Sequence, residues 1–295
     1  MNLSEDTVRN LRTAGLDPAE SSALVRAALA EDLRYGPDVT TRATVPAEAV
    51  ATASFNTREA GVVAGLPFVL AVLDETIGPD GYQVLSAVPD GGEVAAAECV
   101  LAVRAPVDGL LTAERTALNL LCHLSGVATA TAAWVAAVRD SHCVIRDSRK
   151  TVPGVRLPQK YAVRCGGGSN HRLGLGDAML VKDNHVAAAG SVTAALRACR
   201  EYAPELELEV EVSDLDELDE VLPETPALVL LDNFTPGDCA EAVRRAAARS
   251  PRTGLEASGG LTLDVAPTYA ATGVHYLAVG ALTHSAGVLD IGLDM

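Results

Sequence analysis

From about residue 143 onward, short aliphatic runs alternate with amphipathic segments, in units of roughly 25 residues. Six runs predict strands, at 143–147, 178–182, 207–212, 227–231, 254–257 and 275–279. Helices are expected between them, at 191–202, 214–221, 238–250 and 263–271. Regular strand–helix alternation is typical of a parallel α/β sheet, and six strands are too few for a closed eight-fold barrel. We therefore predict an open, incomplete β/α barrel.

The chain before this alternation follows a different pattern. Strand-like runs at 50–56, 61–65, 82–88 and 99–105 mix with helical segments at 20–33 and 67–77, without strict alternation. This mixture predicts an α/β sandwich. We expect the sandwich in residues 1–116 and the barrel in residues 117–285. The tail, about 286–295, is expected to complete the sandwich as an edge strand.

A long helix is expected over residues 112–140, interrupted near Ser125-Gly126. Arg115 would then lie in its first turn, where the helix dipole disfavours a cation. We therefore expect Arg115 to point at a specific group, and a subunit interface is one place for such a group.

The protein is acidic, since 39 Asp and Glu residues against 23 Lys and Arg give a formal net charge of -16. This charge argues against nucleic acid or an anionic membrane as partner. The cations are unevenly placed, however. Eight Lys or Arg residues lie between Arg146 and Lys182, and all three lysines of the chain, Lys150, Lys160 and Lys182, are among them. Such a concentration predicts an anion site, and the alternative is a solvated basic face.

The remaining composition indicates an ordinary soluble protein. None of the six cysteines forms a CxxC pair, so we expect reduced core residues rather than a zinc site or a disulfide framework. The N-terminal residues lack the features of a secretory signal, and the apolar stretch 127–138 is too short to span a bilayer. We expect a cytoplasmic location and no membrane partner.

In a β/α barrel the residues that end each strand face the active site. The first strand ends in Asp147-Ser148-Arg149-Lys150, and the second ends in Lys182, with His185 as support. The third carries Glu209 and Glu211 on one face, and the fourth ends in Asp232. Cations followed by carboxylates predict a site for a polyanion and its metal. We take Glu211 and Asp232 as ligands for Mg²⁺ and ribose hydroxyls, while the alternative for one glutamate is a core arginine partner.

Glycine turns follow at the later strand ends. Ser258-Gly259-Gly260 and Gly280 are expected to offer backbone amides to a phosphate. A third run, Gly166-Gly167-Gly168, serves no predicted helix or strand and is expected where the backbone approaches a ligand or turns sharply. His171 and Arg172 follow it and are expected to contact an anion.

Short segments along the whole chain carry a resemblance to a known family. In chain order they are 31–33, 38–41, 114–119, 147–154, 160–164, 166–168, 170–172, 182–185, 231–234, 256–260 and 279–285. Here the sequence resembles the quinolinate phosphoribosyltransferase family, and 147–185 is the most specific part. Two departures are visible: Ser148 stands where Thr is usual, and Arg34-Tyr35-Gly36-Pro37 lengthens a link that is usually short.

The resemblance implies an activity and its substrates. The enzyme would transfer the phosphoribosyl group of phosphoribosyl pyrophosphate to quinolinate with decarboxylation, giving nicotinate mononucleotide, pyrophosphate and CO₂ for NAD biosynthesis. It would use Mg²⁺ and no organic cofactor. It would be a homodimer or higher homo-oligomer with a shared active site.

The resemblance also implies roles for individual residues. Arg115 would reach in from the partner subunit, and Arg149, His171 and Arg172 would bind the two quinolinate carboxylates, with Ser148 beside them. Lys150 and Lys182 would neutralise quinolinate and pyrophosphate, and with Glu211 and Asp232 they would form the catalytic set. Glu211 and Asp232 would hold the ribose hydroxyls and Mg²⁺. The residues expected to bind the 5′-phosphate are Ser258, Gly259, Gly260 and Gly280.

Three other functions compete with this reading. A Schiff-base lyase would use Lys150 or Lys182 as nucleophile, which leaves the neighbouring arginines and glycine turns unexplained. A related transferase would act on another aromatic acid. A non-catalytic sensor would bind a phosphoribosyl ligand without turnover.

Overall fold

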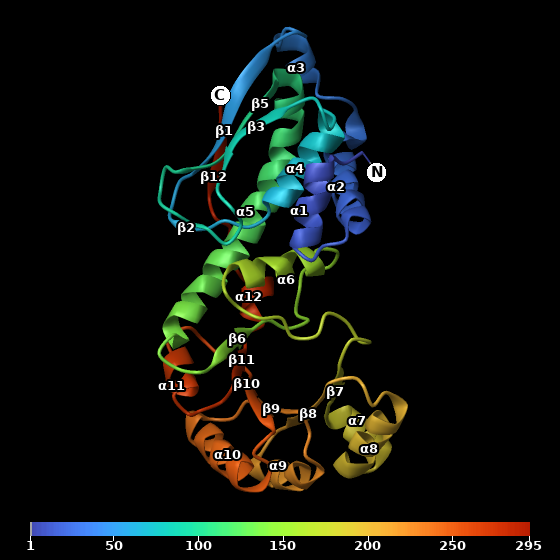
Figure 1. Cartoon of the computed structure of the whole chain (residues 1–295), viewed down its shortest axis with the longest axis vertical. Coiled ribbons are helices and arrows are strands. Elements are labelled where there is room, and N and C mark those ends of the chain that lie inside the picture. Colours follow the sequence, from blue (N-terminus) through green and yellow to red (C-terminus); the bar gives the residue numbers. More distant parts are fainter. Residues whose placement is uncertain (1) are drawn as a thin grey trace. The chain divides into compact units, whose positions relative to one another are not determined.

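The computed structural model describes residues 2–295 and has two compact units (Figure 1). The first unit contains residues 2–132, 151–167 and 283–295. The second contains residues 133–150 and 168–282. Residues 117–132, 151–167 and 283–285, expected in the barrel, thus belong to the first unit.

The first unit is an antiparallel sheet with helices packed beside it (Figure 1). Its sheet has the order β12-β1-β5-β3, and β12 (Ile291–Asp294) pairs with β1 (Val50–Thr57), as expected for the tail. Helix α4 (Leu66–Thr76) contacts α1 and α2, and its Phe68, Val72 and Leu73 are fully buried. The other early elements are α1 (Glu5–Thr13), α2 (Pro18–Asp32), η1 (Leu33–Tyr35), α3 (Val39–Thr44), β2 (Gly61–Val62), β3 (Gln83–Ala87), β4 (Glu93–Val94) and β5 (Cys99–Pro106).

Helix α5 (Val107–Val138) is continuous, so the interruption expected near Ser125-Gly126 is wrong. Gly126 serves close packing instead, because a Cβ added to it would lie 1.9 Å from the carbonyl oxygen of Gly287. The helix also begins earlier than expected, so Arg115 lies beyond its first turn and the argument from the helix dipole fails.

Helix α5 is long and apolar enough, by length and composition, to cross a membrane. Its Ala117, Leu121 and Leu124 are nevertheless buried within the structure. The same length and composition occur in the core helices of globular proteins.

The second unit is an open β/α barrel, which confirms the predicted fold. Its six parallel strands have the order β6-β11-β10-β9-β8-β7, so β6 and β7, consecutive along the chain, lie at opposite ends of the sheet. The strands are β6 (Val144–Arg146), β7 (Met179–Val181), β8 (Leu208–Val212), β9 (Leu228–Asp232), β10 (Gly254–Ser258) and β11 (Tyr276–Ala278).

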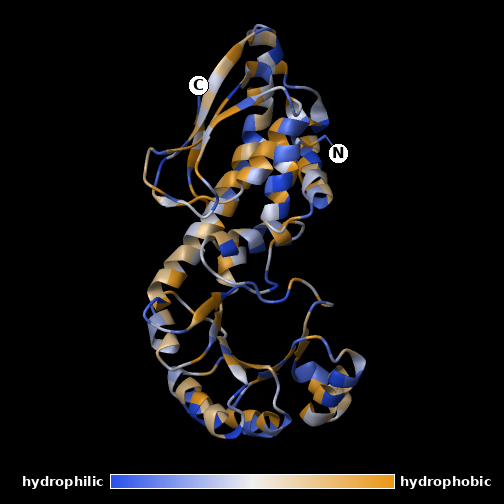
Figure 2. Ribbon diagram, viewed as in Figure 1, coloured by the Kyte–Doolittle hydropathy of each residue, from blue (hydrophilic) through white to orange (hydrophobic). Residues whose placement is uncertain are grey.

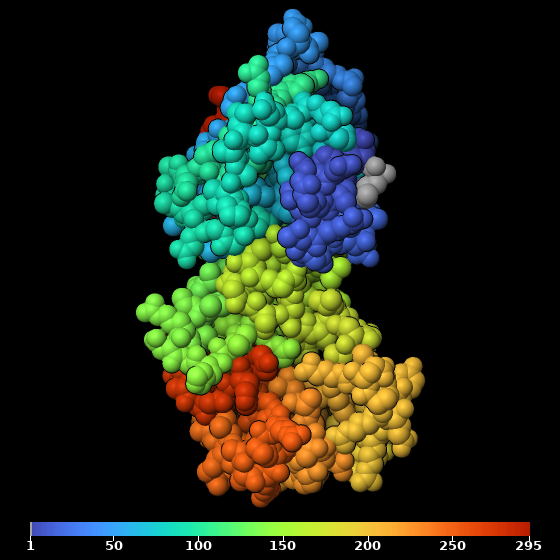
Figure 3. Space-filling view, viewed as in Figure 1, coloured from blue at the N-terminus to red at the C-terminus, as the bar shows by residue number. Residues whose placement is uncertain are grey.

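Apolar residues concentrate on the barrel strands (Figure 2). The outer helices bury one face only: in α10 (Pro236–Arg249) the buried residues Cys239, Ala242 and Ala246 recur at helical spacing. Helices α7 (Asp183–Ala189) and α8 (Val192–Tyr202), gold in Figure 3, lie on the surface of this unit. The remaining elements are α9 (Leu215–Val221), η2 (Leu222–Glu224), α11 (Ala266–Ala270) and α12 (Ala281–His284).

The glycine run turns the chain, which is one of its two expected roles. It follows α6 (Arg156–Cys165), a helix that the sequence did not predict, and Gly166 is the C-cap of that helix. A Cβ added to Gly166 would lie 2.3 Å from the carbonyl oxygen of Ala128 on α5. Gly166 therefore ends a helix and allows close packing of two helices.

Candidate active site

The carboxyl ends of the six parallel strands meet at one edge of the barrel, so the side chains that leave them share that edge. Lys182 follows β7, and its ammonium forms an ion pair with Glu211 of β8. The Lys182 side chain is 42% exposed and that of Glu211 is 16% exposed, so water or a ligand can reach the pair. The predicted cation and carboxylate thus lie together.

Asp232, at the end of β9, lies on the same face of the sheet as Glu211. The register places Glu211 opposite Leu230, and Asp232 is two residues further along the strand. Both carboxylates supply the hard oxygen ligands that Mg²⁺ prefers. They belong to neighbouring strands and are partly exposed, which fits a divalent cation at this edge.

The turn after β10 is hydrogen-bonded to the turn after β9 and packs closely against it. Asn233 adopts a left-handed conformation (φ 58°), and its backbone N–H donates to the carbonyl oxygen of Ser258 at 2.8 Å. Gly259 has φ +103°, and a Cβ there would lie 2.2 Å from Oδ1 of Asn233. A side chain at Gly259 is therefore excluded. Gly260 is exposed beside it, and Gly280 is half-buried after β11.

The two arginines expected to bind carboxylates both lie in the second unit. Burial and the positive charge of Arg149 lower the pKa of Arg172. The Nε atoms of Arg149 and Arg172 are buried and have no hydrogen-bond partner, although Arg172 Nη1 donates to the Ala178 carbonyl at 3.2 Å. Two neighbouring guanidinium groups with buried donors to spare are suited to a bound anion.

Lys150 is exposed after β6, and its backbone N–H donates to Oγ of Ser148 at 3.1 Å. His185 acts within its own turn, because its Nδ1 accepts from the backbone N–H of Lys182 at 3.0 Å. Arg115 is exposed on α5 in the first unit, and its role at a partner's site stays a prediction. We call Lys182, Glu211 and Asp232, at the ends of the neighbouring strands β7, β8 and β9, the outer cluster.

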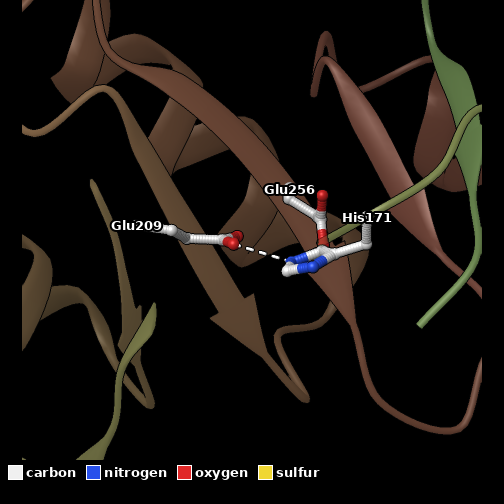
Figure 4. Close-up of side chains that lie close together, drawn as sticks. All are labelled: His171, Glu209 and Glu256. Atoms are coloured by element: carbon white, nitrogen blue, oxygen red, sulfur yellow. Dashed lines mark hydrogen bonds and ion pairs between the residues drawn. The ribbon is translucent and has the colours of Figure 1, made fainter. Parts of the chain in front are cut away.

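A second group of titratable side chains is more deeply buried in the second unit, on β6, β8 and β10 and on the segment between α6 and β7. Figure 4 shows His171, Glu209 and Glu256 gathered together, with His171 Nε2 2.7 Å from Glu209 Oε2 and 3.6 Å from Glu256 Oε1. Arg146 of β6 pairs with Glu256 Oε2 at 2.8 Å. Among the described residues, His171, Glu209 and Glu256 also form a group that could offer three ligand atoms to a metal. We call these four residues the inner cluster.

Burial in the inner cluster affects the pKa and the hydrogen bonding of its carboxylates. Burial and the neighbouring Glu209 carboxylate raise the pKa of Glu256 to about 7, although His171 and Arg146 oppose the shift. Glu209 Oε1 and Glu256 Oε1 are buried without a hydrogen-bond partner. On β8, Glu209 thus pairs with His171 and Glu211 with Lys182, rather than with the core arginine considered as an alternative.

The sequence prediction left out Arg146 and Glu256. A signal existed, because Glu256 stands between Leu255 and Ala257 in a strand whose interior is otherwise apolar. A buried charge within a strand needs a partner from another element. That partner, Arg146, is 110 residues away in the sequence.

Comparisons with known proteins agree with this geometry. Residues 38–125 match the model of the quinolinate phosphoribosyl transferase N-terminal domain, and residues 127–294 match that of the C-terminal domain. A nicotinate-nucleotide pyrophosphorylase [carboxylating] of Mycobacterium leprae is 60% identical over 271 residues, which cover 92% of this chain and 95% of that protein. The human protein of the same name is 38% identical over 283 residues, covering 95% and 93%.

The fold is also found in solved structures. The nicotinate-nucleotide pyrophosphorylase of Francisella tularensis superposes with a TM-score of 0.88 at 36% identity, covering 94% of this chain and 96% of that one. Similarity in sequence and fold thus extends over both units. The chain belongs to the quinolinate phosphoribosyl transferase family.

Proposed function

We propose that this enzyme transfers the phosphoribosyl group of phosphoribosyl pyrophosphate to quinolinate and releases CO₂, giving nicotinate mononucleotide and pyrophosphate. Family membership over both units supports the proposal. The observation that carries it is the pair of guanidinium groups, Arg149 and Arg172, in a barrel whose neighbouring strand ends carry Lys182, Glu211 and Asp232.

The acceptor has two ring carboxylates, and the arginines suit them. A guanidinium group can donate two parallel hydrogen bonds to one carboxylate, which fixes orientation as well as charge. Arg149 and Arg172 would each hold a carboxylate, with Ser148 and Lys150 near them. Arg115 of a partner subunit would complete the site in a homodimer or larger homo-oligomer.

The donor would lie along the later strands. The turn Ser258-Gly259-Gly260 and Gly280 would offer backbone to the 5′-phosphate, and Gly259 lets this turn pack against Asn233, which fills the space that a side chain would need. Glu211 and Asp232 would hold the ribose hydroxyls and Mg²⁺. When bound, Mg²⁺ neutralises charge on the pyrophosphate leaving group.

The reaction builds positive charge on C1 of the ribose as pyrophosphate leaves. The Glu211 and Asp232 carboxylates would stabilise this charge, while Lys150 and Lys182 would bind the departing phosphates. The pyridine nitrogen then bonds to C1, so the ring becomes cationic. The C–CO₂ bond at position 2 breaks, its electron pair stays on the cationic ring, and a proton replaces CO₂. No organic cofactor is needed, and the expected cytoplasmic location stays a prediction.

The proposal is tested with purified protein, quinolinate, phosphoribosyl pyrophosphate and Mg²⁺. We expect nicotinate mononucleotide and one CO₂ per product, and we expect EDTA to remove activity until Mg²⁺ is restored. Nicotinate in place of quinolinate is the control, since it would release no CO₂. A folded protein that gives no product contradicts the proposal, and trapping of a carbonyl substrate on Lys150 or Lys182 by borohydride would favour a Schiff-base lyase.

A further inference from the structure

We propose that Asp177 is a positioning residue that closes the loop after Arg172 and thereby holds the Arg172 guanidinium where a carboxylate of the acceptor binds. The inference deepens the proposed function and rests on it, because that function assigns Arg172 to the acceptor. Between Arg146 and Lys182 the sequence has eight Lys or Arg residues and two acidic residues, which are Asp147 and Asp177.

The loop between Arg172 and β7 is closed by the Asp177 carboxylate. Its Oδ2 accepts the backbone N–H of Leu173 at 2.6 Å, and its Oδ1 accepts that of Gly174 at 2.7 Å. Leu173 is 44% exposed and Leu175 is 73% exposed, so packing contributes little to the shape of this loop. A segment with few buried contacts depends on its hydrogen bonds for order. The Asp177 carboxylate therefore sets the path of the backbone that leaves Arg172.

The Arg172 side chain is bonded to the far end of the same loop. Its Nη1 donates to the carbonyl oxygen of Ala178, the residue after Asp177, at 3.2 Å. A change in the shape of the loop would therefore move this carbonyl relative to the guanidinium. The loop that Asp177 closes thus determines both the backbone direction after Arg172 and the place of an acceptor for its side chain.

The backbone before Arg172 is held by the other carboxylate. Asp147, fully buried after β6, accepts the backbone N–H of His171 at 2.8 Å and the side-chain amide of Asn170 at 2.7 Å. Arg172 thus lies between two segments that are each bonded to a carboxylate. Asp177 is exposed, so substitutions there test the arrangement without opening a cavity in the core.

Asp177 acts on Arg172 through its charge and through its hydrogen bonds. Burial would raise the pKa of Asp177, but hydrogen bonds from the loop and the Arg172 charge together lower it. The Asp177 charge in turn opposes the lowering of the Arg172 pKa that burial and Arg149 cause. Water screens the attraction between an exposed carboxylate and its partner. We therefore expect the hydrogen bonds that close the loop to contribute more than the charge does.

Substitutions at Asp177 separate these two contributions. Asp177→Asn removes the charge and keeps a side-chain oxygen for the loop, whereas Asp177→Ala removes both. We expect the quinolinate KM to rise about tenfold in Asp177→Ala and less than about threefold in Asp177→Asn. The KM for phosphoribosyl pyrophosphate should change less than about twofold in both variants, because the donor would lie along the later strands. Equal increases in the two variants, or for the two substrates, would overturn the proposal.

Asp17→Ala is the matched control. Asp17, before α2 in the first unit, is also exposed and also accepts two backbone N–H groups, from Ala19 at 2.8 Å and from Glu20 at 2.9 Å. We expect Asp17→Ala to lose about as much stability as Asp177→Ala and to leave the quinolinate KM unchanged. If the control raises this KM as much as Asp177→Ala does, the KM follows stability and the positioning role is wrong.

A double-mutant cycle shows whether Asp177 acts through Arg172. Arg172→Lys keeps a positive charge and loses the planar guanidinium. If Asp177 positions that guanidinium, Asp177→Ala should raise the quinolinate KM less than about twofold in the Arg172→Lys background. The same increase in both backgrounds would mean that Asp177 acts independently of Arg172, against the proposal.

Hydrogen exchange measured by mass spectrometry tests the loop without turnover. The N–H groups of Leu173 and Gly174 should exchange at least about tenfold faster in Asp177→Ala than in the wild type. Unchanged exchange would show that Asp177 does not close the loop. A folded wild type that gives no product would contradict the proposed function alone, since the exchange result does not depend on catalysis.

Discussion

Two glutamates of β8, two residues apart on one face, belong to clusters with opposite properties. Glu209 lies in the inner cluster, where His171 and a buried environment surround it. Glu211 lies in the outer cluster, paired with a lysine whose side chain is 42% exposed. A buried hydrogen-bonded pair resists exchange, whereas an ion pair open to water can exchange its partner for a ligand. Depth along the strand therefore separates supporting charges from those suited to a polyanionic substrate.

The largest effect is expected from Lys182→Ala in the outer cluster. Loss of a cation that meets developing charge should lower kcat/KM by about a thousandfold. The free energy of unfolding should change by less than about 1 kcal/mol, because the ion pair is partly exposed. Arg197→Ala is the control, since Arg197 forms an exposed ion pair with Glu224 on the outside of the same unit. If Lys182→Ala lost stability together with activity, the outer cluster would contribute to folding as the inner cluster does, and the proposed difference between the two clusters would be wrong.

The comparison is tested directly by Glu209→Ala and Glu211→Ala. Removing the buried carboxylate that pairs with His171 leaves the ring without that hydrogen-bond partner and should lower the free energy of unfolding by about 1–3 kcal/mol in Glu209→Ala. In Glu211→Ala the loss should stay below about 1 kcal/mol, and activity should fall instead. Urea denaturation measures both variants. Equal losses of stability would show that depth along β8 does not govern the role of the carboxylate.

Glu256→Gln should reveal the raised pKa of the inner cluster. The pKa of Glu256 is about 7 in the folded protein against an ordinary value of 4.5, so the folded state retains a proton that the unfolded state has lost. Wild-type stability should therefore fall as pH rises from 4.5 to 7. Over this range of 2.5 pH units, the free energy of unfolding of Glu256→Gln should rise relative to that of the wild type by at most about 3 kcal/mol.

Thermal or urea unfolding at several pH values measures this gain, and Glu241→Gln is its control. Hydrogen bonds from Arg244 and Arg245 lower the pKa of the partly exposed Glu241 to about 2. The stability of Glu241→Gln relative to wild type should therefore not vary between pH 4.5 and 7. A flat difference for Glu256→Gln would mean that Glu256 is already ionised in the folded protein at pH 4.5.

The smallest effect is expected at the turn after β10. Gly260 has φ +57° with open space around it, so Gly260→Ala should lower the free energy of unfolding by only about 1 kcal/mol. Gly259→Ala should be worse, because the added Cβ would meet Asn233. It should also raise KM for phosphoribosyl pyrophosphate. Equal behaviour of the two variants would show that Gly259 has no special steric role.

The barrel was predictable because its signals are local. Strand and helix periods alternate along the sequence, and the outer-cluster residues follow strand ends, where the fold class already places active sites. Lys182 and Glu211 could be assigned to the site in advance for this reason. Their ion pair with each other was not predicted and is seen only in the structure.

The inner cluster and some of the helical structure depend on distant residues. Arg146 and Glu256 meet only in the folded sheet, so neither strand alone showed their pairing. Helix α6 contains Pro158, which the first turn of a helix tolerates, and ends at a glycine that packs on α5. Gly126 was predicted to interrupt the helix. In the structure, its close approach to Gly287 explains why glycine stands there.

The position of β12 has a consequence for synthesis on the ribosome. Residues 291–294 complete the first sheet by pairing with β1, whose partner residues run from Ser54 to Thr57. That edge of β1 thus stays unpaired until residues 291–294 have left the ribosomal tunnel. Until then it presents unpaired backbone groups that could pair with another nascent chain. A stop codon just before residue 291 would therefore yield a chain prone to aggregation, although every outer-cluster and inner-cluster residue precedes that point.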